Sequence, residues 1–302
     1  MVLKRLLNGI LITDGCKLVY TGRNKYIIKP PDFLVILYFI VLSTLIIVCR
    51  KNVTNWEIYI FWHVIIILIF ITINIFIIEK NPYYKAFKDW YIIFCFIFMY
   101  IELGKLVPLV IQDYQDPVFI KIDHFIFQNP PSIYFYRIFN NKIISEVMHI
   151  GYFSYFFLIP TMGLLLYLKK KYEEFDMFVF SISLTYITCY LFFVIYPVAG
   201  PRFFLPGADM LEVKGLLYTD IIHNIISNSA IKGAAFPSSH VAIATVVLFT
   251  AWKFERKSFW VYLYFVSTLT LGTVYGRYHY VIDSIAGVFY GYFCYKIAPV
   301  IM

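Results

Sequence analysis

Charged side chains are scarce in this sequence: Asp, Glu, Lys and Arg make up 15% of its 302 residues. Soluble domains of average composition carry about 25% charged residues and about 45–50% apolar ones, whereas 61% of this chain is hydrophobic. A single soluble core cannot bury that much apolar surface, so lipid must cover part of it. The composition therefore excludes an ordinary soluble domain and predicts an all-α, polytopic integral membrane protein.

Cysteine is also sparse and forms no pattern typical of a metal site. The five cysteines show no CxxC or other metal-ligand spacing, and isolated thiols in apolar segments are mostly packing residues. Acidic residues number 18 against 26 Lys and Arg, which gives a net charge of +8. Nucleic-acid-binding proteins do not contain such long apolar runs, so we expect no nucleic-acid partner and assign the positive charge to cytoplasmic loops.

A cleavable signal sequence is not evident, because the first long apolar run begins only at Phe33, after a basic and moderately apolar segment. A membrane-spanning helix needs about 20 mostly apolar residues. We predict a helical bundle of about eight spans, within a range of six to eight. The candidate spans are 33–49, 56–78, 91–111, 147–168, 177–199, 239–252, 259–275 and 281–299.

The distribution of Lys and Arg predicts the orientation of these spans. Most of these residues fall in segments that lie on one side if the N-terminus is cytoplasmic, as the positive-inside rule requires. We therefore expect both termini in the cytoplasm and the protein in the cell (inner) membrane. The predicted divisions are an N-terminal basic segment with accessory spans (1–111), an extracytoplasmic loop (112–146) and a transmembrane catalytic core in the C-terminal half (147–302).

Three short polar stretches lie where apolar segments begin or end, and the predicted topology puts all three at the extracytoplasmic face. The first is Gly200-Pro201-Arg202-Phe203, which follows the fifth span. The guanidinium of Arg202 can bind a phosphate through two parallel hydrogen bonds. A lone arginine at the membrane interface is more often an anchor to lipid headgroups, so this stretch does not decide the function alone.

The second stretch, Phe236-Pro237-Ser238-Ser239-His240, has the features of a helix start: a proline, a serine able to cap, and then an apolar run. Free backbone N–H groups and the positive end of the dipole at a helix N-terminus suit a phosphate. His240 in that first turn would be placed to protonate a leaving oxygen. An ordinary helix cap with an interfacial histidine explains the stretch at least equally well.

The third stretch runs from Gly276 to Gly287 and contains His279 and Asp283, which are four residues apart. On a helix they share one face, so the carboxylate can hold one imidazole nitrogen and leave the other free to attack. A salt bridge or a pair of metal ligands has the same spacing. Arg277 beside them would repel a metal cation and favours an anionic substrate.

Together, Gly-Pro-Arg, Phe-Pro-Ser-Ser-His and Arg-Tyr-His-Tyr-Val-Ile-Asp resemble the type 2 phosphatidic acid phosphatases, or lipid phosphate phosphatases. Within that superfamily they look most like the branch of the inositol phosphorylceramide synthases, over roughly residues 145–299. The resemblance implies that His279 is a nucleophile forming a phosphohistidine, that Asp283 orients it and that His240 protonates the leaving group. Phosphate binding then falls to Arg202, Arg277, Ser238 and Ser239, with neither a metal nor another cofactor.

The chain departs from the simple phosphatases of that superfamily at several motif positions. Ile195 stands where they have a lysine, Thr273 where they have an arginine, Phe203 where they have a proline and Ser239 where they usually have a glycine. These departures weaken the assignment to a plain phosphatase. A headgroup phosphotransferase, which passes the phosphoryl group of a membrane lipid to an alcohol such as inositol or ceramide, stays open.

Other buried polar residues have less specific explanations. Glu146, His149 and Tyr152 open the fourth span on the side of the three motifs and are candidates to line the pocket. His63 and Asn74 in the second span are better explained as interhelical hydrogen-bond partners. Two other functional classes also stay open: a membrane transporter or flippase, and a non-catalytic homologue of the phosphatases.

Overall fold

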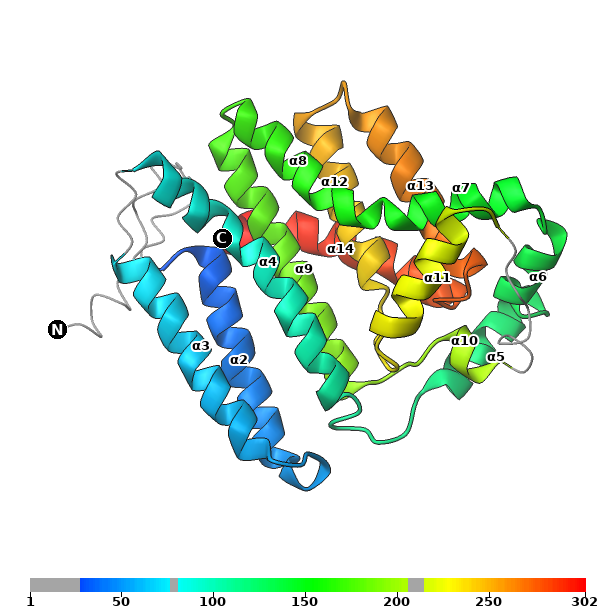
Figure 1. Ribbon diagram of the computed structural model, residues 1–302, viewed down its shortest axis with the longest axis horizontal. Helices are drawn as coiled ribbons and strands as arrows, with labels where there is room; N and C mark the ends of the chain where they lie inside the picture. Colours follow the sequence, from blue (N-terminus) through cyan, green and yellow to red (C-terminus); the bar gives the residue numbers. More distant parts are fainter. Residues whose placement is uncertain (1–27, 77–80, 206–214) are drawn as a thin grey trace. The chain divides into compact units, whose positions relative to one another are not determined.

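The computed structural model describes residues 28–76, 81–205 and 215–302, and the regular structure in these ranges is helical, as the composition predicted (Figure 1). The chain divides into two compact units. One comprises Met1–Phe96 with Met302, and the other comprises Ile97–Ile301.

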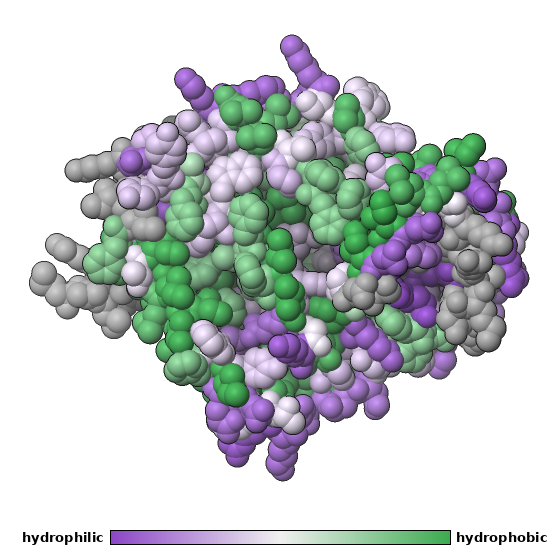
Figure 2. Space-filling model, in the orientation of Figure 1, coloured by the Kyte–Doolittle hydropathy of each residue, from purple (hydrophilic) through white to green (hydrophobic). Residues whose placement is uncertain are grey.

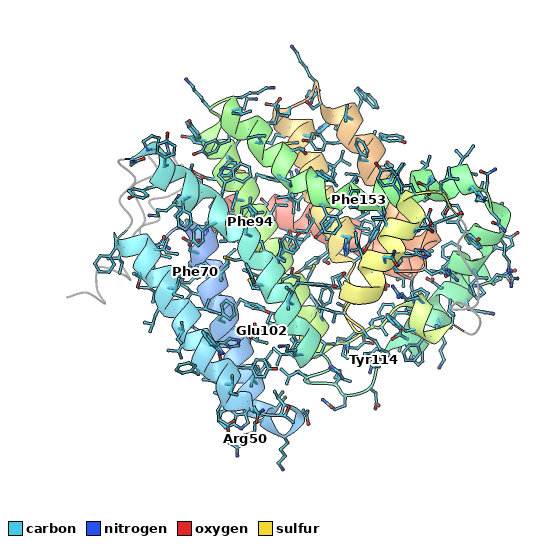
Figure 3. The ribbon with its side chains drawn as sticks, viewed as in Figure 1. Arg50, Phe70, Phe94, Glu102, Tyr114 and Phe153 are labelled. Atoms are coloured by element: carbon cyan, nitrogen blue, oxygen red, sulfur yellow. The ribbon has the colours of Figure 1, made fainter. Side chains whose placement is uncertain are left out.

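The first unit contains the antiparallel helices α2 (Pro30–Val48) and α3 (Trp56–Phe76), which the short 3-10 helix η1 (Arg50–Asn52) connects, and the first part of α4 (Pro82–Leu106) (Figure 1). Polar side chains join the helices: the Ser43 hydroxyl lies 2.7 Å from His63 Nδ1, and the Asn74 amide donates to Asp32 at 2.6 Å. Phe70 on α3 packs against Tyr91 of α4, with ring centroids 5.5 Å apart (Figure 3). The predicted interhelical role of His63 and Asn74 is confirmed.

The second unit is built around α12 (Ser239–Phe254), which contacts α8, α9, α13 and α14. The other helices of this unit are α5 (Asp116–Phe127), α6 (Pro131–Ile138), α7 (Lys142–Phe153), α8 (Tyr155–Leu168), α9 (Tyr172–Ile195), α10 (Pro201–Phe204), α11 (Tyr218–Ser229), α13 (Phe259–Tyr275) and α14 (Val281–Ile301). Glycine allows α14 to lie directly on α12, because a Cβ atom at Gly291 would clash with the Ala242 carbonyl oxygen. This close approach brings the first turns of α12 and α14 together.

Within the described residues, four helices are long and apolar enough to cross a membrane, namely α2, α3, α9 and α14, and α7 with α8 forms a fifth candidate that is bent by 48°. Helices α12 and α13 are apolar but shorter. Large apolar side chains stand exposed on these helices, among them Trp62 and Trp260, and hydrophobic residues cover much of the face seen in Figure 2. These features indicate an integral membrane protein, whereas the count of about eight spans stays a prediction.

The predicted extracytoplasmic loop (112–146) and the segment between the fifth and sixth predicted spans contain helices of their own. Residues 112–146 hold α5, α6 and the start of α7, and residues 203–235 hold α11. Helix α5 contacts α14, α6 contacts α13, and α11 contacts α7. As Figure 1 shows, α5, α6 and α10 gather at the same end of the second unit, where α13 ends and α14 begins.

Candidate active site

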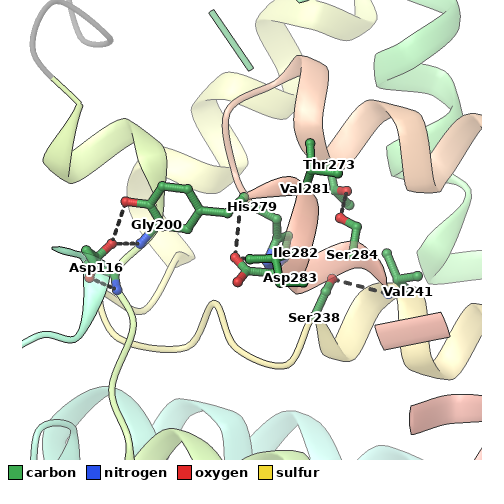
Figure 4. A network of polar contacts seen from close by, with 12 residues as sticks. Asp116, Gly200, Ser238, Val241, Thr273, His279, Val281, Ile282, Asp283 and Ser284 are labelled. Atoms are coloured by element: carbon green, nitrogen blue, oxygen red, sulfur yellow. Dashed lines mark hydrogen bonds and ion pairs between the residues drawn. The ribbon is translucent and has the colours of Figure 1, made fainter. Parts of the chain in front are cut away.

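Backbone hydrogen bonds tie the three polar stretches to one another. The Arg202 amide donates to the Arg277 carbonyl at 3.2 Å, and the Ser238 amide donates to the Asp283 carbonyl at 3.2 Å. The first and second stretches are joined just before their motifs, where the Ala235 amide donates to the Val198 carbonyl at 2.9 Å. Stretches that are up to about eighty residues apart in sequence therefore form one site (Figure 4).

His279 and Asp283 face each other at the centre of this site. Nδ1 of His279 lies 3.6 Å from Oδ2 of Asp283, and both side chains are buried. We predicted the pair from helical spacing, but His279 lies in the turn before α14, which begins at Val281. The turn is held by the Thr273 carbonyl, which accepts from the His279 amide at 3.1 Å, and Oδ2 of Asp283 accepts from the Tyr280 amide at 2.9 Å.

The protonation state of His279 suits a nucleophile. Burial lowers the pKa of its imidazole to about 4, and a hydrogen bond with the Ala235 backbone opposes that shift only in part. At neutral pH the ring is therefore uncharged, and one of its nitrogens carries a lone pair. An uncharged histidine whose other nitrogen faces a carboxylate is the arrangement that nucleophilic catalysis requires.

His240 lies in the first turn of α12, opposite His279. The Ser238 hydroxyl accepts from the Val241 amide at 3.4 Å, so Ser238 caps the helix, and Ser239 is its first, buried residue; the predicted helix start is confirmed. The rings of His240 and His279 are 6.1 Å apart between centroids. Nε2 of His240 is 3.2 Å from the Tyr152 hydroxyl, so one of the three predicted pocket residues contacts a predicted catalytic histidine.

Arg202 at the start of α10 and Arg277 in the turn before α14 both lie near Tyr278. Gly200 precedes α10 with φ of 100°, and a Cβ atom there would stand 2.7 Å from the Tyr278 carbonyl oxygen, so only glycine permits this close contact between the two stretches. Burial raises the pKa of the Tyr278 hydroxyl, and the positive charges of Arg202 and Arg277 both oppose that rise. Among the described residues no carboxylate forms an ion pair with Arg202.

Two of the motif positions at which this chain departs from the phosphatases, Thr273 and Ile195, hold uncharged side chains. The Thr273 hydroxyl bonds the Ser284 hydroxyl at 2.9 Å, in the interior of the α13–α14 turn (Figure 4). Ile195 ends α9 with its side chain partly exposed. The positively charged residue nearest to Thr273 in the sequence is Arg277, two residues before His279.

Two aspartates of α5 hold the first and third stretches in place, and neither was among the predicted site residues. The buried carboxylate of Asp116 accepts from the Ala199 and Gly200 amides, each at 2.8 Å, and from the Tyr280 hydroxyl at 2.9 Å (Figure 4). Asp123 accepts from the Val281 amide at 3.1 Å and from the next amide at 3.3 Å, at the start of α14. Burial raises the pKa of Asp116, and these hydrogen bonds oppose the rise.

The other two predicted pocket residues have different surroundings. Glu146 accepts from the Tyr218 amide at 2.9 Å and from the Thr219 amide and hydroxyl at 3.1 and 2.9 Å, so its carboxylate caps the N-terminus of α11. Nδ1 of His149 donates to the Ser145 carbonyl at 2.7 Å, and its ring lies 5.2 Å from that of His223, a residue that the sequence analysis did not single out. Among the described residues no group of three His, Cys, Asp or Glu side chains is arranged to hold a metal ion.

Comparison with known proteins agrees with this geometry. A family model described as the PAP2 superfamily matches residues 118–297, which is more than half of the chain and contains all three stretches. The chain belongs to the PAP2 superfamily. Membership indicates phosphatase-type phosphoryl transfer and is consistent with a lipid substrate.

A curated relative is more distant. A protein of Dictyostelium discoideum described as a PA-phosphatase related-family protein is 24% identical over 178 residues, which is 52% of this chain and 32% of the relative. The matched part thus spans about a third of the relative's length. No solved structure matches the chain.

Proposed function

We propose that this PAP2 superfamily member is a membrane-embedded enzyme that transfers the phosphoryl group of a lipid phosphate or a phospholipid headgroup through a phosphohistidine at His279. The observation that carries the proposal is the buried, uncharged His279, which lies between Asp283 and His240. Soluble substrates would not need such a site at the ends of apolar helices, whereas a lipid offers its phosphate at that depth.

In the first half of the reaction, the His279 nitrogen that faces away from Asp283 leaves the Ala235 backbone and attacks phosphorus, with the ring proton on Nδ1 beside Asp283. An N–P bond forms and the bond to the leaving oxygen breaks. His240, in the protonated form that the negative charge of a bound phosphate favours, supplies the proton that the leaving oxygen takes up. Asp283 stabilises the imidazole as it becomes cationic. In the second half, His240 takes a proton from water or an alcohol, the oxygen attacks phosphorus, and His279 is released.

Charge on the phosphoryl oxygens requires fixed donors during both halves. The guanidinium groups of Arg202 and Arg277, together with the N–H groups at Ser238 and Ser239 in the first turn of α12, can serve as those donors without a metal ion. The second substrate determines the activity: water makes the protein a phosphatase, and an alcohol such as inositol or ceramide makes it a headgroup phosphotransferase. The charge distribution supports an extracytoplasmic active site with cytoplasmic termini.

Trapping of the labelled intermediate tests the proposal. The purified full chain, reconstituted in lipid nanodiscs and given a lipid phosphate labelled at phosphorus, is expected to carry a label that is stable to base and labile to acid. His279→Ala should lose the label, and a matched control variant, His124→Ala, should keep it because His124 is exposed on α5. The proposal fails if His279→Ala keeps the label. Lipid movement across vesicles by the wild type without any phosphate chemistry would favour a transporter instead.

A further inference from the structure

A second polar cluster adjoins His240 across two tyrosine rings. The Tyr152 ring stacks on His240 with centroids 5.1 Å apart and on Tyr278 with centroids 4.7 Å apart. Beyond Tyr278 lies His149 of α7 at 6.5 Å, and then His223 of α11 at 5.2 Å from His149. The row of rings therefore leads from the site of phosphoryl transfer into a neighbouring site that the proposed reaction does not use.

Two buried polar atoms of this cluster have no hydrogen-bond partner in the described part of the chain: Nε2 of His149 and the hydroxyl oxygen of Tyr278. The partner of His149 Nδ1 is a backbone carbonyl, which can only accept, so Nδ1 carries the proton. In the uncharged ring Nε2 is then a hydrogen-bond acceptor. Leaving such a buried group unsatisfied costs about 1–3 kcal/mol, which calls for a specific reason.

The charged groups around the cluster narrow the chemistry of what binds there. The positive charges of Arg202 and Arg277 lie near both Tyr278 and His223, and the carboxylate of Asp220 lies near His149 and His223. Burial lowers the pKa of His223 to about 4 with the help of the two arginines and against the effect of Asp220, so its ring is uncharged at neutral pH. The arginines only donate hydrogen bonds, whereas Nε2 of His149 only accepts them. A phosphate oxygen without a proton satisfies only the arginines, but an alcohol hydroxyl accepts from an arginine and donates to His149.

We propose that the His149–Tyr278–His223 cluster binds a non-reacting hydroxyl of a polyhydroxylated alcohol whose reacting oxygen lies between His240 and His279. This inference rests on the proposed function and names part of its substrate. The alcohol can come from two sources, because it is either the headgroup of the donor lipid or the acceptor that resolves the phosphohistidine. A lipid phosphate monoester, or an alcohol with a single hydroxyl, has no group that reaches the cluster.

Two variants remove the proposed contacts and keep the volume of the side chain. His149→Leu removes the acceptor, and Tyr278→Phe removes the hydroxyl group. The controls are His124→Leu and Tyr134→Phe, because both residues are exposed on α5 and α6. All four proteins are compared with the wild type as full chains in nanodiscs, and phosphohistidine formation from a labelled lipid phosphate shows that each is folded.

Paired substrates separate the two sources. In the donor arm, the variants are given phosphatidylinositol and phosphatidic acid, and in the acceptor arm the preformed phosphohistidine is resolved by inositol and by ethanol. In one of the two arms, we expect the rate with the polyol substrate (phosphatidylinositol or inositol) to fall about tenfold more than the rate with its paired substrate (phosphatidic acid or ethanol). The loss of one hydrogen bond predicts a difference of this size. Equal losses within both pairs, or no loss in either, would overturn the inference.

Direct binding keeps the inference testable if no phosphohistidine forms and the proposed function fails. Saturation-transfer NMR with inositol needs no turnover. If inositol contacts the wild type and both controls but not His149→Leu or Tyr278→Phe, the result supports the cluster as a polyol site independently of the reaction. Absence of contact with the wild type, or contact that the two variants retain, overturns it.

Discussion

Buried charged and amide side chains have different surroundings in the two units of this protein. In the first unit, Asp32 accepts from the Asn74 amide, the Asn74 oxygen accepts from the Lys29 backbone amide at 3.0 Å, and the Lys29 ammonium pairs with Asp89 at 2.7 Å. In the second unit, by contrast, Nδ1 of His279 and Oδ1 of Asp283 in the candidate site are buried without a hydrogen-bond partner among the described residues.

The difference separates a network that stabilises the fold from a site that binds a ligand. A buried hydrogen bond contributes about 1 kcal/mol to stability, whereas an unsatisfied buried group costs about 1–3 kcal/mol. Natural sequences retain such unsatisfied groups mainly at functional sites, where the groups bind a ligand or react with it. We infer that polar groups inside an apolar bundle are a weak sign of function by themselves, and that their unsatisfied atoms are the stronger sign.

The test with the largest expected effect replaces one buried histidine from each unit. His240→Ala is expected to lower kcat for a lipid phosphate by about 10²–10⁴, because the leaving oxygen loses its proton donor. An activated aryl phosphate, whose leaving group needs no proton, should lose far less. His63→Ala in the first unit removes the contact with Ser43 and should change stability rather than chemistry. Equal losses for both leaving groups would rule out an acid role for His240.

The next test removes a carboxylate that positions the site without touching the substrate. Asp116→Ala leaves three buried donors unsatisfied, at the Ala199 and Gly200 amides and the Tyr280 hydroxyl. We expect kcat to fall about 10- to 100-fold with little change in KM, and Asp116→Asn to recover part of the loss. Asp113→Ala, at an exposed position of the same segment, is the control. A lower melting temperature with unchanged kcat would make Asp116 purely structural.

Much of the helical class and part of the site could be predicted from the sequence, because local patterns determine them. The start of α12 follows from a proline, a capping serine and an apolar run, and the contact between His279 and Asp283 was inferred from spacing alone. That spacing argument assumed a helix at His279, whereas the tight turn before α14 brings the same two side chains together. Here a correct contact came from an incorrect local geometry.

The residues that were missed depend on tertiary contacts between distant segments. Asp116 bonds Gly200 and Tyr280, which are 84 and 164 residues away along the chain. A signal was nevertheless present, because Asp116 and Asp123 are seven residues apart and therefore lie on one face of a helix inside an otherwise apolar segment. Glu146 shows the converse, since its carboxylate was predicted for the pocket but accepts from the first backbone amides of α11.

The smallest expected effect on activity comes from the satisfied network of the first unit. Asn74→Leu breaks the hydrogen bonds to Asp32 and to the Lys29 backbone and leaves the buried Asp32 carboxylate without this donor. We expect the free energy of unfolding to fall by about 1–3 kcal/mol, while kcat per folded molecule stays within about twofold of the wild type. Thr72→Leu, which changes an exposed position on the same helix, is the control for added apolar surface. If Asn74→Leu lowers kcat as strongly as Asp116→Ala does, the network of the first unit supports the active site, and satisfied and unsatisfied polar groups cannot be assigned separate roles.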